Sequence, residues 1–171
     1  LNNNEIRKLN DIAKKYNIKY QNKHKLDLVD EILSNVDVIP NSIALAQAAI
    51  ESGWGKSRFA KEYNALFGEY TYDDSEGVIP LERENGDTHL IKAFNSYSNS
   101  VESYFDNINS HYAYEDFRDI RNIMRKRNNF ANVNLLVNKL STYAEDENYI
   151  KTIKQVIKTN NFNIFDKKTI T

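Results

Sequence analysis

One carboxylate in the sequence stands in a setting suited to acid catalysis. Glu51 follows the apolar run Ile43–Ile50, whose composition indicates a helix that ends at this glutamate. The negative end of the helix dipole and the apolar neighbours both favour the protonated carboxyl, so we expect a raised pKa. A carboxyl that keeps its proton near neutral pH can protonate the leaving oxygen of a glycosidic bond. On position alone, a surface glutamate at a helix end is an equally good interpretation.

Glycoside hydrolysis usually needs a second carboxylate, either as a nucleophile close to the acid or as a base farther away that holds water. Candidates flank the Asn85-Gly86 pair, which favours a tight type I′ hairpin turn. A two-residue turn there would place Glu84 opposite Asp87. The same register would place Glu82 opposite His89, on the same strand face as Glu84. A glutamate near a hairpin tip is also commonly just solvated, and that alternative stays open.

Apolar periodicity identifies the elements that must position these groups. Residues repeat every three or four positions over 5–16 and 26–33, which predicts two amphipathic helices. A third helix should begin near Pro40 or Ser42. It is apolar nearly all round, so we expect it to be central and buried on every side. Gly53 and Gly55 should end it, and a short helix can restart after Ser57.

The helical period disappears between Glu69 and Phe94, where Val78–Glu84 and Thr88–Phe94 read as the two arms of a hairpin. Pro80 restricts its strand to an edge position, because proline cannot donate a ladder hydrogen bond. Helices then resume to the end of the chain. We therefore predict an α+β, mainly α fold: a single domain over 1–171 with a small β lobe at about 69–94. The expected helix cores are Val101, Tyr104, Phe105 and Ile108; Phe117, Ile120 and Met124; Val133, Leu136, Val137 and Leu140; and Tyr149, Ile150, Ile153, Val156 and Ile157.

Composition excludes several classes of function. The 171 residues carry 23 Lys plus Arg against 24 Asp plus Glu, so no global positive field gathers a polyanion, and nucleic acid is not an expected partner. Cysteine is absent, which rules out disulfides, thiolate metal sites and a cysteine nucleophile. No apolar run is long enough to span a membrane. The first residues lack the layout of a signal peptide, and we interpret the start at Leu1 as a trimmed or mature end.

Three further groups of residues give no indication of phosphate binding, a metal site or another functional site. Gly55-Lys56-Ser57 resembles the end of a phosphate-binding loop, but that motif needs glycine where Ile50 stands. Three histidines are isolated in sequence, so we expect no metal and no cofactor: His24, His89 and His111. A basic stretch is interpreted as a solvated helix face that could touch anionic wall polymer: Arg121, Arg125, Lys126 and Arg127.

Four separated motifs resemble one known family. The run ALAQAAIESGWGKS at residues 44–57 resembles the catalytic-helix motif of glycoside hydrolase family 73 and its Bax-type relatives. NALFG at residues 64–68 is similar to the family's Asn-Leu-Phe-Gly segment, with Ala65 as an extra residue. YAEDENY at residues 143–149 resembles Tyr-Ala-Thr-Asp-x-x-Tyr, with Glu145 in place of Thr. The stretches 36–47 and 77–81 also look Bax-like, so the resemblance spans about residues 36–157.

The resemblance implies a lysozyme-like helical domain with Glu51 as general acid, in a cleft between the helical body and the hairpin lobe. It makes Glu84 the first choice for the second catalytic carboxylate, with Glu82 and Glu76 in reserve. A third route, in which the substrate's own acetamido group is the nucleophile, stays open. The substrate-binding candidates within the motifs are Ser52, Trp54, Asn64, Phe67, Tyr143 and Tyr149. For Phe67 and Tyr149, core packing is at least as good an interpretation.

The function so implied is an endo-β-N-acetylglucosaminidase that hydrolyses β-1,4 bonds of bacterial cell-wall peptidoglycan or another N-acetylglucosamine-containing glycan. Alternatives are a lytic transglycosylase, a glycoprotein endoglycosidase and, from a different class, a non-catalytic glycan-binding module. The intact motif around Glu51 argues against a binding module, because a protein that only binds glycan does not need a glutamate that donates a proton. A peptidoglycan substrate predicts a periplasmic or extracellular location, and we expect a monomer.

Overall fold

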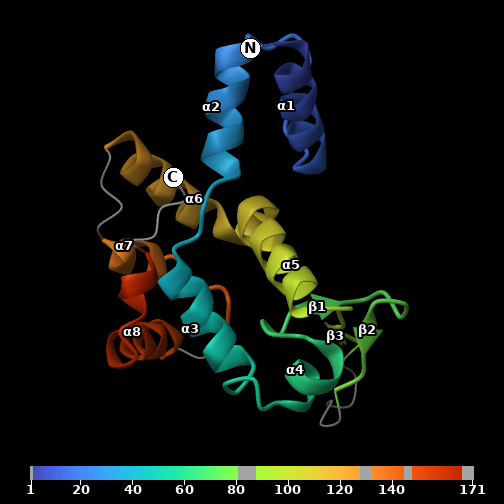
Figure 1. Cartoon of the computed structure of the whole chain (residues 1–171), viewed down its shortest axis with the longest axis vertical. Helices are drawn as coiled ribbons and strands as arrows, with labels where there is room; N and C mark the ends of the chain where they lie inside the picture. The colour runs from blue at the N-terminus through green and yellow to red at the C-terminus, as the bar shows by residue number, and fades with distance from the viewer. Residues whose placement is uncertain (1, 81–87, 128–131, 145–147, 167–171) are drawn as a thin grey trace. The chain divides into compact units, whose positions relative to one another are not determined.

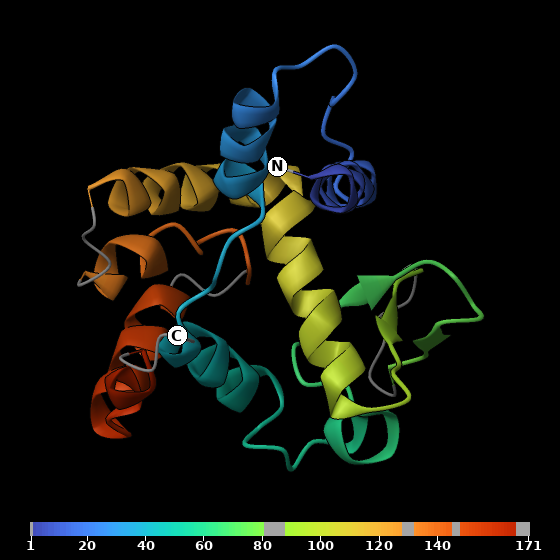
Figure 2. The ribbon, with the colours of Figure 1, turned by 45° about the horizontal axis from the view of Figure 1, so that its top comes forward.

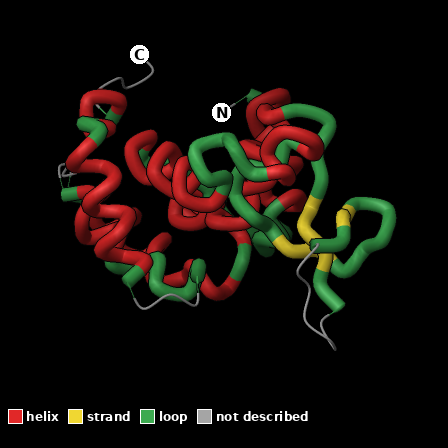
Figure 3. The backbone as a smooth tube through the Cα atoms, turned by 90° about the horizontal axis from the view of Figure 1, so that it is seen from below, coloured by secondary structure: helices red, strands yellow, loops and turns green. Residues whose placement is uncertain are grey.

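The computed structural model describes residues 2–80, 88–127, 132–144 and 148–166. By their contacts the residues form two compact units. One unit combines Leu1–Ile39 with Asp106–Ile150, and the other combines Pro40–Phe105 with Lys151–Thr171. The interpretation of the whole chain as one domain stays a prediction. Helix dominates the described residues, and the strands are confined to one small sheet (Figure 3).

The first unit is helical. It holds α1 (Asn3–Lys15), α2 (Lys25–Asn35), the 3-10 turn η1 (Tyr112–Tyr114), α6 (Glu115–Lys126) and α7 (Val133–Val137). Helices α1 and α2 lie side by side (Figure 1), because their apolar faces form a shared cluster. That cluster is made by Ala13, Ile18, Leu28 and Ile32. Helix α6 contacts α2, η1 and α7.

The second unit carries the sheet. Its elements are α3 (Asn41–Glu51), α4 (Arg58–Tyr63), β1 (Tyr70–Thr71), β2 (Gly77–Val78), β3 (Leu90–Lys92) and η2 (Phe162–Phe165). Helices α5 (Tyr97–Ser110) and α8 (Tyr149–Thr159) each contribute residues to both units. The sheet order is β1-β3-β2 with antiparallel pairing, and Figure 2 shows the three strands with the loop that joins β1 to β2. Helix α3 packs against η2.

The structure confirms the mainly helical α+β class and most predicted helices. The helix expected after Ser57 forms with the Ser57 hydroxyl as its N-cap, accepting from the Ala60 N–H at 3.1 Å. Burial of α3 on every side was wrong, since Leu45 is 40% exposed. Ile43 and Ala46 are fully buried, so the helix has one exposed side despite its apolar composition.

The β lobe differs in detail from the predicted hairpin. Strand β1 was not predicted, and β2 is an edge strand, as Pro80 requires. The ladder pairs Val78 with Ile91, whereas an uninterrupted hairpin closed by a two-residue Asn85-Gly86 turn would pair Val78 with Ala93. The observed pair thus differs by two residues from that extrapolation of the turn. The turn and the predicted Glu84–Asp87 and Glu82–His89 pairs lie outside the described residues.

The basic stretch on α6 is not a uniformly solvated face. Arg121 is fully buried, and its guanidinium donates to Asn109 Oδ1 at 2.7 Å and to the Asn35 carbonyl at 2.7 Å. Arg125 forms an ion pair with Asp37 that raises the pKa of the guanidinium. The interpretation as a solvated surface was therefore wrong for Arg121, which holds α6 against the chain that leaves α2.

Candidate active site

Glu51 is the last residue of α3, and its side chain is half-buried. The helix ends because the backbone leaves right-handed geometry directly after the C-cap residue Ser52. Gly53, Trp54 and Gly55 have φ values of 57°, 60° and 71°. Two of these left-handed positions are glycines, which adopt such angles without a steric penalty. The two glycines of the motif thus end the helix at the candidate acid, as the sequence predicted.

Ser52 holds this turn together from within. Its hydroxyl donates to the Ala48 carbonyl at 2.5 Å and accepts from the Gly55 N–H at 2.7 Å. The Ser57 N–H donates to the Ser52 carbonyl at 2.9 Å. Ser52 is only 2% exposed, so its hydroxyl serves the turn that places Glu51. A substrate contact for Ser52 stays a prediction.

Trp54 is presented to solvent by the same turn. Its indole is 55% exposed and lies at a tilt to the Phe162 ring, with 6.3 Å between the ring centroids. A left-handed φ is rare for a bulky residue and marks local strain. Strained backbone of this kind clusters at functional sites, so Trp54 stays a good candidate for a glycan contact.

Residues 64–69, here called the 64–69 segment, connect α4 to β1 and are anchored on both sides. Asn64 caps α4 with a left-handed φ of 53°, and its side-chain Nδ2 donates to the Phe94 carbonyl at 2.9 Å. The Leu66 N–H donates to Ser100 Oγ at 3.1 Å. Asn64, predicted as a substrate contact, therefore has a structural role in fixing this segment.

The same segment is tied to α5 by a buried ring stack. Phe67 is 3% exposed, and its ring stacks on Tyr104 with 4.0 Å between centroids. The Tyr104 hydroxyl donates to Gln47 Oε1 at 2.7 Å, and Ser103 Oγ donates to Glu69 Oε2 at 3.0 Å. Phe67 is therefore a core residue. Its position favours the core-packing interpretation over a substrate contact.

Gly68 brings this segment to the candidate acid. It has a φ of +61°, and a Cβ atom built on it would lie 3.4 Å from Glu51 Oε2. The two motifs at residues 44–57 and 64–68 therefore meet at one carboxyl oxygen. The sequence placed Gly68 in a family-like motif but did not indicate this contact, nor the Gln47–Tyr104 bond beneath it.

The remaining predicted residues fall into three groups. Tyr143 is half-buried and stacks on Tyr149, with 5.8 Å between centroids and 3° between ring planes, and Tyr149 is 3% exposed. Both belong to the unit that does not contain Glu51, so their place in the site stays a prediction. Glu84 and Glu82 lie outside the described residues. Glu76 is exposed and lies 3.8 Å from the Lys92 ammonium.

Metal ligands do not gather in the described part of the chain. No group of three or more His, Cys, Asp or Glu side chains there could hold a metal ion. In the same residues, no helix is both long and apolar enough to cross a membrane.

Comparisons with known proteins agree on one family. The family model for mannosyl-glycoprotein endo-beta-N-acetylglucosaminidase, named Glucosaminidase, matches residues 26–162. Protein bax of Escherichia coli strain K12 is 34% identical over 140 residues, which is 82% of this chain and 49% of that protein. Peptidoglycan hydrolase FlgJ of Escherichia coli O157:H7 is 35% identical over 92 residues, covering 48% of this chain and 29% of FlgJ. The chain thus spans half or less of these relatives.

A solved structure supports the fold. The catalytic domain of the autolysin Auto from Listeria monocytogenes superposes with a TM-score of 0.55 over 97% of this chain and 89% of that one, at 19% identity. The family model covers most of the chain, and its ends enclose both Glu51 and Gly68. The chain belongs to the glucosaminidase family of glycoside hydrolases.

Proposed function

We propose that this domain hydrolyses β-1,4 bonds next to N-acetylglucosamine in bacterial peptidoglycan, with Glu51 as the general acid. The observation that carries the proposal is the position of Glu51 at the end of α3, where its side chain is half-buried and one carboxyl oxygen lies close to Gly68. FlgJ, one of the similar proteins, is named a peptidoglycan hydrolase. That name supports the wall polymer as the substrate.

In the proposed reaction, Glu51 donates its proton to the glycosidic oxygen as the bond to the anomeric carbon breaks. Glu84 is the proposed second carboxylate, with Glu82 and Glu76 as the reserve candidates. Glu84 would act either as the base that activates water or as the nucleophile. If the substrate's own acetamido group is the nucleophile, Glu84 would only assist the reaction and would not be essential. The separation of the two carboxyl groups distinguishes the first two routes.

The glycan would be held by stacking as well as by hydrogen bonds. Sugar rings present apolar C–H faces, and the exposed indole of Trp54 lies only three residues after the acid. Tyr143 and Asn64 are the proposed further contacts. Action on peptidoglycan places the protein in the periplasm or outside the cell, and we propose that it acts as a monomer.

Digestion of purified peptidoglycan by the wild type and by Glu51→Gln tests this proposal. The substitution keeps the shape of the side chain but removes the transferable proton, so turnover should be abolished while glycan binding and the fold are retained. Mass spectrometry before and after borohydride reduction should find reducing-end N-acetylglucosamine with the wild type only.

The other outcomes point to other functions. Anhydromuramic ends would identify a lytic transglycosylase. Activity only on a high-mannose glycoprotein would favour the substrate named in the family description. Binding of glycan with no Glu51-dependent product on either substrate would identify a binding module.

A further inference from the structure

We propose that Phe162 is a positioning residue for Trp54, and that its ring holds the Trp54 indole as a surface on which a sugar ring of the glycan stacks. The inference rests on the proposed function, in which Trp54 contacts the glycan. It assigns to the 3-10 turn η2 a part in substrate binding that no motif of the sequence indicated.

Trp54 has a fixed backbone and an exposed side chain. Its N–H donates to the Ala49 carbonyl at 2.7 Å, and the residue is 55% exposed. An exposed side chain that rotates freely loses conformational entropy when it binds a ligand, and this loss weakens binding. A ring that is already held in place binds at a lower entropic cost, so the neighbours of the indole matter for the affinity for glycan.

Phe162 provides the ring that lies against the indole. The two ring centroids are 6.3 Å apart and the ring planes are inclined by 51°, which is within the range in which aromatic pairs attract each other. Phe162 is itself half-buried, and its ring also contacts Phe165 with 6.5 Å between the centroids. It can therefore support the indole while more than half of Trp54 stays open to a ligand.

The 3-10 turn η2 is anchored on the first turn of α3. Asn41 Nδ2 donates to the Phe165 carbonyl at 2.9 Å. The Ser42 N–H donates to Asp166 Oδ1 at 2.8 Å. The N-cap residue Pro40 provides no side-chain acceptor, so the Asp166 carboxylate takes the role of a cap for α3. These bonds fix η2 to the helix that carries the candidate acid, and all of these residues belong to one unit.

Both ends of α3 are thus in contact with η2 and the residue that follows it. Phe165 and Asp166 bind the first turn of the helix. Phe162 lies against Trp54, in the turn that follows Glu51 at the other end. The position of the indole relative to Glu51 therefore depends on η2 as well as on the turn itself. A sugar-binding ring at a fixed distance from the acid helps to present the glycosidic bond to it.

The test uses the single tryptophan of the chain, since tryptophan-selective emission reports Trp54 alone. Phe162→Leu keeps apolar bulk and removes the ring, whereas Phe162→Tyr keeps the ring. Phe165→Leu is the matched control, because it removes a ring of η2 that contacts Phe162 and, among the described residues, makes no ring contact with Trp54.

The probe is soluble glycan strands of peptidoglycan, freed of their peptides. Titration of the Trp54 emission in a Glu51→Gln background gives Kd, and hydrolysis with Glu51 intact gives kcat and KM. Thermal unfolding checks that each variant is folded.

Phe162→Leu should lower the emission anisotropy of Trp54 and raise both Kd and KM at least about threefold, because the indole loses the ring that holds it. Its kcat should change by less than about twofold, since a contact made equally in the ground state and the transition state affects KM alone. Phe162→Tyr should retain the wild-type anisotropy and Kd. Phe165→Leu should leave Kd within about twofold of the wild-type value.

Three results would overturn the inference. One is an equal rise of Kd in Phe162→Leu and Phe165→Leu, which would mean a general loosening of η2. Another is a lower anisotropy with an unchanged Kd, because holding the indole would then not serve binding. The third is a Trp54 emission that does not respond to the glycan strands, since the indole would then not contact them. Cleavage of the strands by Glu51→Gln would instead refute the proposed acid, and it leaves the comparison of Kd values intact because the emission is read before products accumulate.

Discussion

Replacing the buried arginine of α6 should destabilise the protein markedly. Arg121 is fully buried, and its guanidinium donates to Asn109 Oδ1 at 2.7 Å, to the Asn35 carbonyl at 2.7 Å and to the Asp37 carbonyl at 3.0 Å. Two of these acceptors are backbone carbonyls at or just past the end of α2, where no further helical N–H is available. Arg121→Met keeps an apolar stem of similar reach and removes the guanidinium that donates these bonds.

The magnitude follows from two opposing contributions. Three hydrogen bonds from a charged donor contribute roughly 2 kcal/mol each, or about 6 kcal/mol together. Burial lowers the pKa of the Arg121 guanidinium to about 10, and this lowering corresponds to about 3 kcal/mol against keeping the charge inside. The substitution should therefore lower the free energy of unfolding by about 3 kcal/mol, which is a Tm loss of roughly 6 to 12 °C for a chain of this length.

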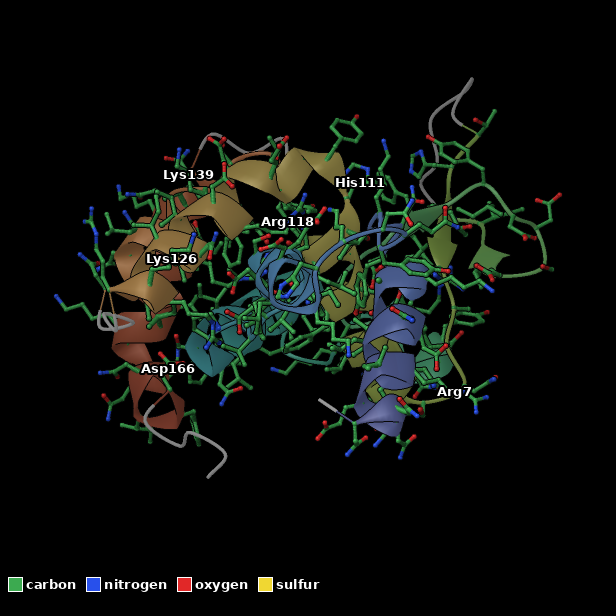
Figure 4. The ribbon with its side chains drawn as sticks, turned by 90° about the horizontal axis from the view of Figure 1, so that it is seen from above. Arg7, His111, Arg118, Lys126, Lys139 and Asp166 are labelled. Carbon is green, nitrogen blue, oxygen red and sulfur yellow. The ribbon has the colours of Figure 1, made fainter. Side chains whose placement is uncertain are left out.

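Thermal unfolding followed by circular dichroism measures this loss. Lys126→Met is the matched control, because Lys126 is exposed on the same helix (Figure 4) and loses the same formal charge. The control should shift Tm by less than about 2 °C. A shift that small for Arg121→Met would refute the reasoning, since it would mean that the three acceptors find other donors, such as water.

Two further substitutions test other parts of the chain. Asp37→Asn removes the partner of Arg125 and should lower stability by about 1 to 2 kcal/mol in urea unfolding, less than for a fully buried pair because Arg125 is 38% exposed. The hydrogen bond to Asp37 raises the pKa of Arg125, so on the alkaline side this stabilisation is lost as pH rises through that raised pKa. Glu84→Gln should lower kcat by at least about 100-fold if Glu84 is the base or nucleophile, whereas the exposed Glu76→Gln should not. Near-normal activity of Glu84→Gln would favour the acetamido route.

The helices were predictable because their sequences carry a local signal. Ser57 caps α4, and the apolar spacing of α1 and α2 follows the helical period, so short windows contain the necessary information. Strand β1 has only the two residues Tyr70 and Thr71, which is too short for a period-two pattern. The register of β2 on β3 could not be extrapolated from the turn dipeptide alone, because Val78 pairs with Ile91.

The position of Arg121 could not be predicted from local sequence. Its neighbours on α6 are charged, and a run of charges is usually a solvated face. What buries it is a set of carbonyls at Asn35 and Asp37, more than eighty residues earlier in the chain. Free carbonyls at a helix end leave no mark in composition or periodicity, so only the fold reveals the partner.

In the candidate site, too, some features were predictable from local sequence and others depend on the fold. Glu51, its helix and the two glycines that end that helix form one continuous stretch, and the sequence was sufficient to place them. Gly68 lies close to Glu51, and the ring and hydroxyl of Tyr104 join the two segments that carry them, which no local pattern relates. Sequence reasoning proposed the chemical group, whereas the surroundings of Glu51 depend on long-range packing.

The turn after Glu51 shows why its motif places a tryptophan between two glycines. Three successive left-handed residues follow the helix cap, and the central one is Trp54. Left-handed geometry costs a bulky residue roughly 1 to 3 kcal/mol, and it persists only where surrounding bonds determine it. Here they do: the Trp54 N–H donates to the Ala49 carbonyl at 2.7 Å, and Ser52 accepts from the N–H groups on the far side of the turn. These hydrogen bonds offset the backbone strain, and the turn holds an exposed indole three residues from a carboxyl. Since the strained turn costs stability, the arrangement is better explained by the proposed glycan binding than by a role in stability.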